Sequence, residues 1–286
     1  MAPPRNKALG SLQRELPFLK DFLDYRLAAF PRLYLLVERF REWVNWDKRV
    51  YLSFVRAGNV VVDVGANVGT HAVFLSHLVR AEGKVLAFEP LPPNIGVLRE
   101  TIWRRSRFPN IEVIQRAVGN PTGAGTEVTM TAPGYDLTQA SLRRHDAGSW
   151  EHENSVREYT VALTSLDAER EVQTLTSIDF VKIDVEGGEL DVWRGAAQTF
   201  RRHHPLVYCE VYEKWASSFG YTPGDLFAFA RSLGYIGARA ISKGVVHALS
   251  LERNTPPGIF ETSSDVLFFT EKHRTAVDAF DKRYLS

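Results

Sequence analysis

A short apolar stretch of this chain runs directly into a glycine-containing turn and then into a helix-like segment. The letters NVVVDVGANVGTHAVFL, residues 59–75, give a β-branched strand, then Gly65 and Gly69, then a helical run. A strand that leads through such a turn into a helix lets the backbone approach a ligand closely and points N–H groups at it. The stretch therefore predicts a ligand-binding strand, turn and helix within an α/β fold.

The same alternation of apolar runs and helix-like segments continues along the chain. We expect strands at residues 60–64, 84–88, 111–116, 180–184 and 206–211. This pattern favours a parallel sheet covered by helices. Between Gly119 and Asp167, TEVTM and REYTVAL predict an inserted hairpin, and GYIGARAI, VVHALSL and DVLFF predict further strands near the end.

Three regions follow from these patterns. Residues 1–57 place apolar residues at spacings of three and four and predict an N-terminal helical extension, as a cap or a lid. Contact with a partner or with a second copy through these helices is an open alternative. Residues 58–275 form the predicted main domain, with the hairpin insert near 120–165, and residues 276–286 form a C-terminal tail.

Composition excludes some classes of partner. Lys and Arg number 35 against 34 Asp and Glu, so no global field attracts a polyanion and we expect no nucleic-acid partner. No apolar run reaches the ~18 residues that a membrane span needs, and the opening MAPPRNKALG lacks the apolar core of a signal peptide. We expect a cytoplasmic protein without a transmembrane segment.

The glycine turn has the form D-x-G-x-N-x-G, built from Asp63, Gly65, Asn67 and Gly69. It departs from the G-x-G-x-x-G form of dinucleotide binders. A pyrophosphate needs bare backbone donors, whereas S-adenosylmethionine carries an ammonium and a sulfonium that a carboxylate such as that of Asp63 complements. We therefore predict S-adenosylmethionine as the cofactor.

Two later strand ends complete the predicted cofactor site. Glu89 follows the second strand, where an acidic side chain can accept the hydrogens of a ribose diol. Ala117 follows the third strand, where the adenine would pack.

A second motif lies at residues 178–196 and reads IDFVKIDVEGGELDVWRGA. In it, an apolar strand is followed directly by acidic residues and glycines. Strand alternation places Lys182 and Asp184 on one face, and Asp184 and Glu186 emerge at the carboxyl edge of the sheet, where ligands bind. Glu210 ends the next strand. Lys182, Asp184, Glu186 and Glu210 are the predicted catalytic residues, and Asp184 also faces the predicted cofactor. One carboxylate could take a proton from a substrate hydroxyl while Lys182 tunes its pKa or orients the acceptor.

Other roles for these residues stay open. Asp184, Glu186 and Glu210 offer the oxygen ligands that Mg²⁺ prefers, and the first two could instead only cap the helix that begins near Gly188. His71, directly after the glycine turn, is a further candidate to face the crevice.

The motifs resemble those of the FkbM-like methyltransferases. The resemblance rests on VVDVGANVGT, FEPLPPN, RAVGN, TSLD, VKIDVEGGELDVWRGA and SDVLFF, between about residues 58 and 270, and leaves residues 1–57 outside. It implies a Rossmann-like class I methyltransferase fold with a seven-stranded, mostly parallel sheet and helices on both faces. It also implies S-adenosylmethionine as cofactor and O-methylation of a hydroxyl on a sugar, glycan or natural product.

Two other functions are compatible with the same fold. An NAD-dependent oxidoreductase is disfavoured by Asp63 and Asn67 in the turn. A non-catalytic binding module would have lost its cofactor pocket, which the set Asp63, Gly65, Gly69 and Glu89 argues against.

Overall fold

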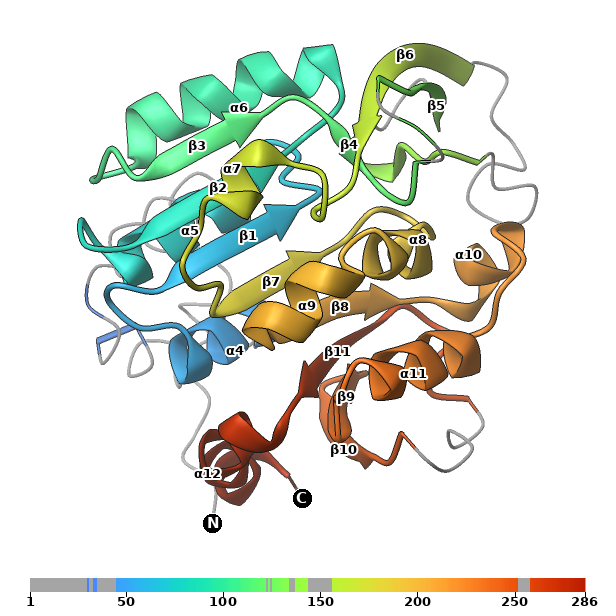
Figure 1. The fold of residues 1–286 in the computed structure, drawn as a ribbon. Helices are drawn as coiled ribbons and strands as arrows, with labels where there is room; N and C mark the ends of the chain where they lie inside the picture. The colour runs from blue at the N-terminus through green and yellow to red at the C-terminus, as the bar shows by residue number, and fades with distance from the viewer. Residues whose placement is uncertain are drawn as a thin grey trace, which may run out of the picture.

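The computed structural model describes residues 30, 33–34, 45–121, 123, 125–133, 137–143, 156–251 and 258–285. Its centre is an eight-stranded sheet in the order β10-β9-β11-β8-β7-β1-β2-β3 (Figure 1). These strands are β1 (Val60–Val64), β2 (Lys84–Phe88), β3 (Ile111–Ile114), β7 (Phe180–Ile183), β8 (Leu206–Val211), β9 (Gly237–Ser242), β10 (Val245–Leu249) and β11 (Ser264–Phe269).

The sheet is parallel from β3 to β8, and its chain order reverses between β1 and β7. From β1 the chain adds β2 and β3 on one side, then crosses to add β7 and β8 on the other. In open α/β sheets a crevice forms at such a reversal, outside the carboxyl ends of the strands. This topology confirms the Rossmann-like α/β fold with its mostly parallel sheet.

The sheet has eight strands, where the resemblance to the FkbM-like methyltransferases implied seven. β9 and β10 form a hairpin across Lys243 and Gly244, which both have positive φ (+49° and +79°). A two-residue turn of this kind matches the twist of antiparallel strands, so both arms join the sheet as separate strands. The third strand is shorter than predicted, because it ends at Ile114 and Ala117–Val118 forms β4 of a different sheet.

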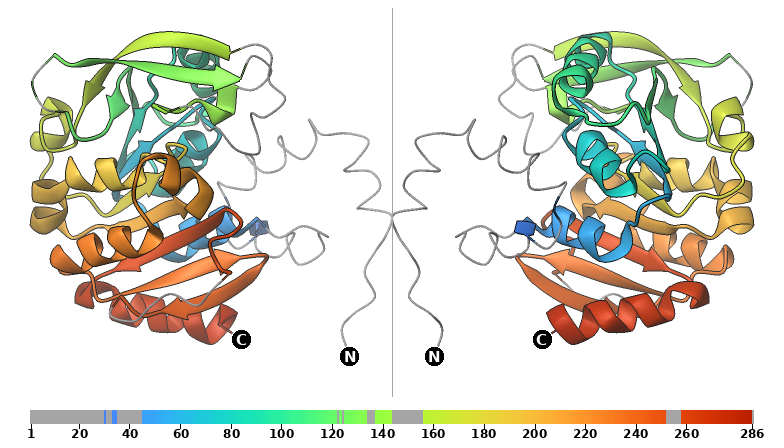
Figure 2. Two further views of the ribbon diagram at one scale, coloured as in Figure 1. Left: turned by 90° about the vertical axis from the view of Figure 1, so that its right-hand side faces the viewer. Right: turned by 90° about the vertical axis from the view of Figure 1, so that its left-hand side faces the viewer.

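Helices cover both faces of the sheet (Figure 2). One face packs against α4 (Trp46–Phe54), α5 (Thr70–Val79), α6 (Pro92–Arg105) and α12 (Arg274–Tyr284). The other packs against α8 (Glu189–Arg194), α9 (Ala197–His203) and α11 (Pro223–Ser232). The shorter α7 (Arg170–Gln173) and α10 (Glu213–Ser218) and the 3₁₀ turns η1 (Leu137–Gln139) and η2 (Glu271–His273) complete the described elements. Strand alternation divides the apolar side chains between the two faces: Val181 and Ile183 face α8 and α9, whereas Phe180 faces α4.

The segment between β4 and α7 forms a second, three-stranded sheet in the order β4-β6-β5. β5 (Glu127–Pro133) and β6 (Val156–Thr164) pair antiparallel over seven residues, and β4 runs parallel to β6. Figure 1 shows this small sheet on the side toward which the carboxyl ends of β1 and β7 point. The hairpin thus stands beside the crevice.

Helices α4 and α12 pack on the same face of the main sheet. Most of the predicted N-terminal extension lies outside the described residues, and so do the expected cap, lid and partner contacts. Its described residues include α4, which is held at its start by Asn45, whose side chain accepts from the Lys48 N–H, and which buries Val50, Tyr51 and Phe54. Residues 276–286, expected as a tail, lie almost entirely in α12, where Val277 and Phe280 are buried. Within the described part of the chain, no helix combines the length and apolarity needed to cross a bilayer.

Candidate active site

A cavity of about 320 Å³ opens at the carboxyl ends of β1, β2 and β7. Of the described residues, its lining includes Gly65, Asn67, Thr70 and His71 from the glycine turn and α5, Glu89 and Asn94 after β2, and Lys182, Asp184 and Glu186 at the end of β7. The two predicted constellations therefore meet in one cavity.

The two glycines of the turn are each required by a different close contact. Gly65 has φ +84°, and a side chain there would collide with the backbone carbonyl oxygen of Asp184. The close approach of β1 to β7 at the floor of the cavity thus requires glycine. Gly69 has φ +86° and begins α5, and a side chain there would collide with Leu98 of α6. Gly69 is not among the described lining residues, so it shapes the packing of the helices behind the cavity.

Glu89 organises the turn. Its Oε2 accepts from the Asn67 N–H at 2.9 Å, and its Oε1 accepts from the Leu91 N–H at 2.9 Å and from the Asn94 side chain at 3.2 Å. Burial raises the pKa of Glu89, and these donors act against that rise. A carboxylate has about four acceptor positions, so roughly one is left for a ligand. The predicted contact of Glu89 with a ribose would use this remaining acceptor position.

Asn67 contributes an acceptor to the same end of the cavity. Its φ is +49°, a conformation that asparagine tolerates better than most residues. Its Oδ1 atom is buried and has no hydrogen-bond partner among the described residues. A buried carbonyl oxygen without a donor is costly, so this atom is suited to receive a ligand N–H or O–H.

The opposite wall is apolar and comes partly from the small sheet. Ala117 lines the cavity as expected, together with Val118 of β4, Met130 of β5 and Leu137 of η1. Ser141 ties this wall to the acidic loop, because its hydroxyl donates to the Glu186 backbone oxygen at 2.8 Å. The sequence predicted this hairpin as an insert, and Met130 on β5 is one of its side chains that line the cavity.

Asp63 lies near the end of β1, within the predicted strand. Its side chain is fully buried, outside the described cavity lining, and it contacts Lys182 Nζ at 3.7 Å. The register of the neighbouring strands β1 and β7 sets Asp63 opposite Lys182. Asp63 complements the charge of a lysine of the protein, and no direct contact with a cofactor follows from the structure.

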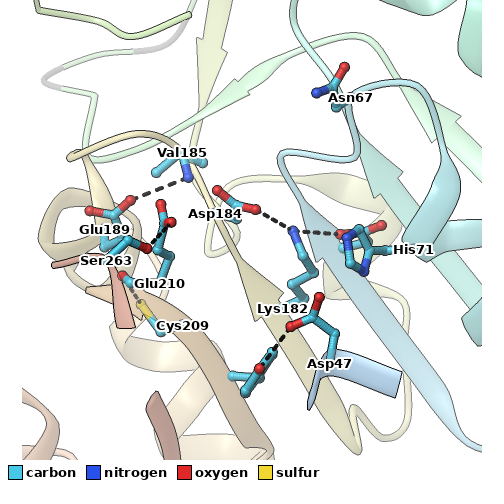
Figure 3. A network of polar contacts seen from close by, with 12 residues as sticks. Asp47, Asn67, His71, Lys182, Asp184, Val185, Glu189, Cys209, Glu210 and Ser263 are labelled. Carbon is cyan, nitrogen blue, oxygen red and sulfur yellow. Dashed lines mark hydrogen bonds and ion pairs between the residues drawn. The ribbon is translucent and has the colours of Figure 1, made fainter. Parts of the chain in front are cut away.

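Lys182 joins Asp63 to Asp184, whose Oδ2 lies 3.0 Å from the ammonium (Figure 3). Burial alone would lower the pKa of Lys182, but the carboxylates of Asp184 and Asp63 outweigh it and raise that pKa. Burial would likewise raise the pKa of Asp184, but Lys182 outweighs it and lowers that pKa. The pair is therefore a stable ammonium and carboxylate, with the carboxylate facing the cavity.

Glu186 and Glu210 gather beside Asp184, and each of the three offers an oxygen within 4.8 Å of the others. Burial, followed by repulsion from Glu210 and Asp184, raises the pKa of Glu186 to about 10. Burial and then Asp184 also raise the pKa of Glu210, which accepts a hydrogen bond from Ser263. Glu210 is not among the described lining residues. Protonation relieves the repulsion among these groups, and a Mg²⁺ ion held by the same three carboxyl groups would relieve it as well.

Two contacts were not anticipated from the sequence. Glu189 was part of the acidic motif without an assigned role. It is buried, and it accepts from the Gly187 N–H at 3.0 Å and from the Tyr221 hydroxyl at 3.0 Å. These hydrogen bonds hold the loop that carries Asp184 and Glu186.

The hydroxyl of Tyr51, from α4, lies 2.9 Å from Nδ1 of His71. No motif includes Tyr51, and nothing in its local sequence distinguishes it from an ordinary core residue.

Comparison with known proteins identifies the family of this chain. The pattern described as methyltransferase FkbM domain matches residues 63–236. Methyltransferase sdnD of Sordaria araneosa is 26% identical over 177 residues, covering 55% of this chain and 67% of that protein. Methyltransferase 1 of Beauveria bassiana is 25% identical over 187 residues, covering 60% of this chain and 72% of its own.

Among solved structures, the methyltransferase FkbM of Methylobacillus flagellatus is 12% identical with a TM-score of 0.41, over 88% of this chain and 60% of that chain. The match to the family pattern spans more than half of the chain and includes the glycine turn, Glu89 and the acidic loop. This chain is a member of the FkbM family of S-adenosylmethionine-dependent methyltransferases.

Proposed function

We propose that this protein methylates a hydroxyl of a sugar, glycan or natural product, with S-adenosylmethionine as the donor. The observation that carries the proposal is that the Asp184 carboxylate and the Glu186 carboxyl group line the same cavity as the glycine turn and Glu89. An acceptor hydroxyl needs hydrogen-bonding groups beside a donor site, and this cavity supplies both.

The lining residues fit S-adenosylmethionine. Asn67 Oδ1 is an unused acceptor, Glu89 has room for one hydroxyl, and Val118 and Met130 give an apolar wall for a base. These groups complement an ammonium, a ribose and an adenine, in that order. When bound, the cofactor supplies an electrophilic methyl group on a sulfonium.

The residues of the acidic loop would position the acceptor. Asp184, held ionised by Lys182 at 3.0 Å, can accept a hydrogen bond from the hydroxyl, and protonated Glu186 can donate one to a neighbouring acceptor oxygen. Glu189 fixes the loop backbone beneath them. Two polar groups held in place suit an acceptor with adjacent oxygens, as in sugars and hydroxylated natural products.

The wall formed by Met130 and Leu137 gives the cavity an apolar side next to these polar groups. A sugar presents apolar C–H faces as well as hydroxyls, so both kinds of surface would contact it. Part of this wall comes from the hairpin insert, which we propose contributes to acceptor choice.

The test is calorimetric titration with S-adenosylhomocysteine and, on the same sample, with NAD. Micromolar binding of the thioether without binding of NAD is the expected result, and absence of binding by both compounds would contradict the proposal. Transfer from radiolabelled S-adenosylmethionine to a panel of glycosides, glycans and hydroxylated polyketides then identifies the acceptor class. Asp184→Asn should keep thioether binding and lose transfer, so full transfer by this variant would contradict the role of Asp184.

A further inference from the structure

Helix α4 contacts a residue of the cavity lining although it precedes the residues that match the family. The match begins at residue 63, whereas α4 ends at Phe54. The Tyr51 side chain is fully buried, and its ring packs edge-on against Phe180 and Tyr208 of the sheet. A tyrosine this deep in an apolar cluster needs a partner for its hydroxyl, and that partner is Nδ1 of His71 at 2.9 Å.

His71 belongs to the cavity itself. It is the second residue of α5, directly after the glycine turn, and it lines the cavity beside Lys182 (Figure 3). With Nδ1 engaged by Tyr51, Nε2 is the ring nitrogen left for a ligand. The contact also fixes the ring plane, because the two rings meet at 87° with centroids 5.8 Å apart.

The groups around His71 keep its ring neutral. Burial is the largest effect and lowers the pKa of His71, and Lys182 lowers it further. Asp47, Asp63 and Asp184 act in the opposite direction without reversing the shift. A neutral imidazole has one nitrogen free to accept a proton.

The titratable lining groups at the end of β7 are less suited to that task. Asp184 is ion-paired with Lys182, Lys182 is itself protonated, and Glu186 holds its proton with a pKa of about 10. Among the described groups in this part of the cavity, His71 is the one that stays neutral and basic near pH 7.

We propose that Nε2 of His71 is the general base for methyl transfer and that Tyr51, delivered by α4, is its positioning residue. This inference rests on the proposed function. As the acceptor oxygen bonds to the methyl carbon, the carbon–sulfur bond breaks and leaves its electron pair on sulfur. The O–H electron pair stays on the acceptor oxygen, and the proton moves to Nε2. For Nε2 to be bare beforehand, the ring proton must lie on Nδ1 and be donated to the Tyr51 oxygen.

The tautomer of His71 can be measured directly by multiple-bond ¹H–¹⁵N NMR on the full chain labelled with ¹⁵N-histidine. His71→Gln identifies the signal by removing it. The expected result at pH 7 is a neutral ring protonated on Nδ1. A ring protonated on Nε2 would overturn the proposal, because it could not accept the proton.

Tyr51→Phe tests the positioning role, since it removes only the hydroxyl. Tyr208→Phe is the matched control: Tyr208 lies in the same aromatic cluster, but its hydroxyl donates to Asp47 at 2.9 Å. Tyr51→Phe should change the tautomer ratio of His71 and Tyr208→Phe should not. Equal spectra for wild type and Tyr51→Phe, or equal changes in both variants, would remove Tyr51 from the mechanism.

Kinetics separate this inference from the proposed function. With an acceptor that the wild type methylates, His71→Gln should lower kcat about 100-fold, a usual contribution of a general base, and leave S-adenosylhomocysteine affinity unchanged. Tyr51→Phe should lower kcat less and leave KM unchanged. Wild-type kcat in His71→Gln would refute the base while leaving the proposed function intact, whereas loss of thioether binding by the wild type would refute the proposed function.

Discussion

Lys182 is the residue on which the buried charges of the site depend. It lies between Asp63 on β1 and Asp184 at the cavity, at 3.7 and 3.0 Å. Asp63 has no hydrogen-bond partner among the described residues, so Lys182 is the described group that compensates its charge. Asp184 is partly solvated, with 37% of its side chain exposed. The two carboxylates therefore depend on Lys182 to different extents.

Lys182→Met should destabilise the protein more than Asp63→Asn. The first change leaves a buried carboxylate without a counter-charge, which costs about 3–5 kcal/mol, whereas after the second Lys182 still pairs with Asp184. Urea unfolding followed by circular dichroism measures both losses. Equal losses would contradict the role of Lys182 as the counter-charge of Asp63.

Glu186 makes stability depend on pH in the direction opposite to that of most carboxylates. Its pKa is about 10 in the folded protein against 4.5 as the ordinary value, so folding favours its protonated form. That contribution is complete below pH 4.5 and is lost as the pH rises toward 10. Glu186→Gln should therefore raise the melting temperature at pH 8.5 more than at pH 5, as differential scanning fluorimetry can measure. A gain that does not change with pH would contradict the protonation state assigned to Glu186.

At the scale of elements, the turn between β1 and α5 carries the closest backbone contact of the site. Gly65 places the end of β1 against the Asp184 carbonyl, and this contact brings the cofactor turn and the acidic loop together. Not every glycine of the chain is constrained in this way. Gly96 lies within α6, where a side chain would meet no atom within 4 Å.

Gly65→Ala and Gly96→Ala should have opposite effects. The first forces a side chain into the Asp184 carbonyl at φ +84°, so it should lower stability by more than about 1 kcal/mol and weaken S-adenosylhomocysteine binding. The second removes a flexible residue from a helix interior and should stabilise by about 0.5–1 kcal/mol. Thermal unfolding with and without the thioether measures both. Unchanged stability in Gly65→Ala would show that the two loops can separate without loss.

At the scale of the whole molecule, the features that could be predicted from the sequence are those that depend on local residue patterns. β1, β2 and β8 begin and end as predicted, because each is an apolar run bounded by turn residues. The meeting of the glycine turn with Asp184 and Glu186 was also predictable, since parallel strands present their carboxyl ends at one edge. The partner of Asp63 depends on register between strands far apart in the chain, and the contact of Tyr51 with His71 depends on how α4 docks. Neither leaves a local pattern.

The segment that matches the family is shorter than the segment that forms the folded domain. Sequence comparison recognises residues 63–236, yet β8 within that range pairs along one edge with β11, which lies beyond it. Cutting the chain at the recognised borders would leave the backbone groups of that edge without partners and uncover Phe180 and Tyr208, which α4 shields. A shortened chain limited to the aligned residues would therefore lack β11 and α4, which complete the sheet and cover its core.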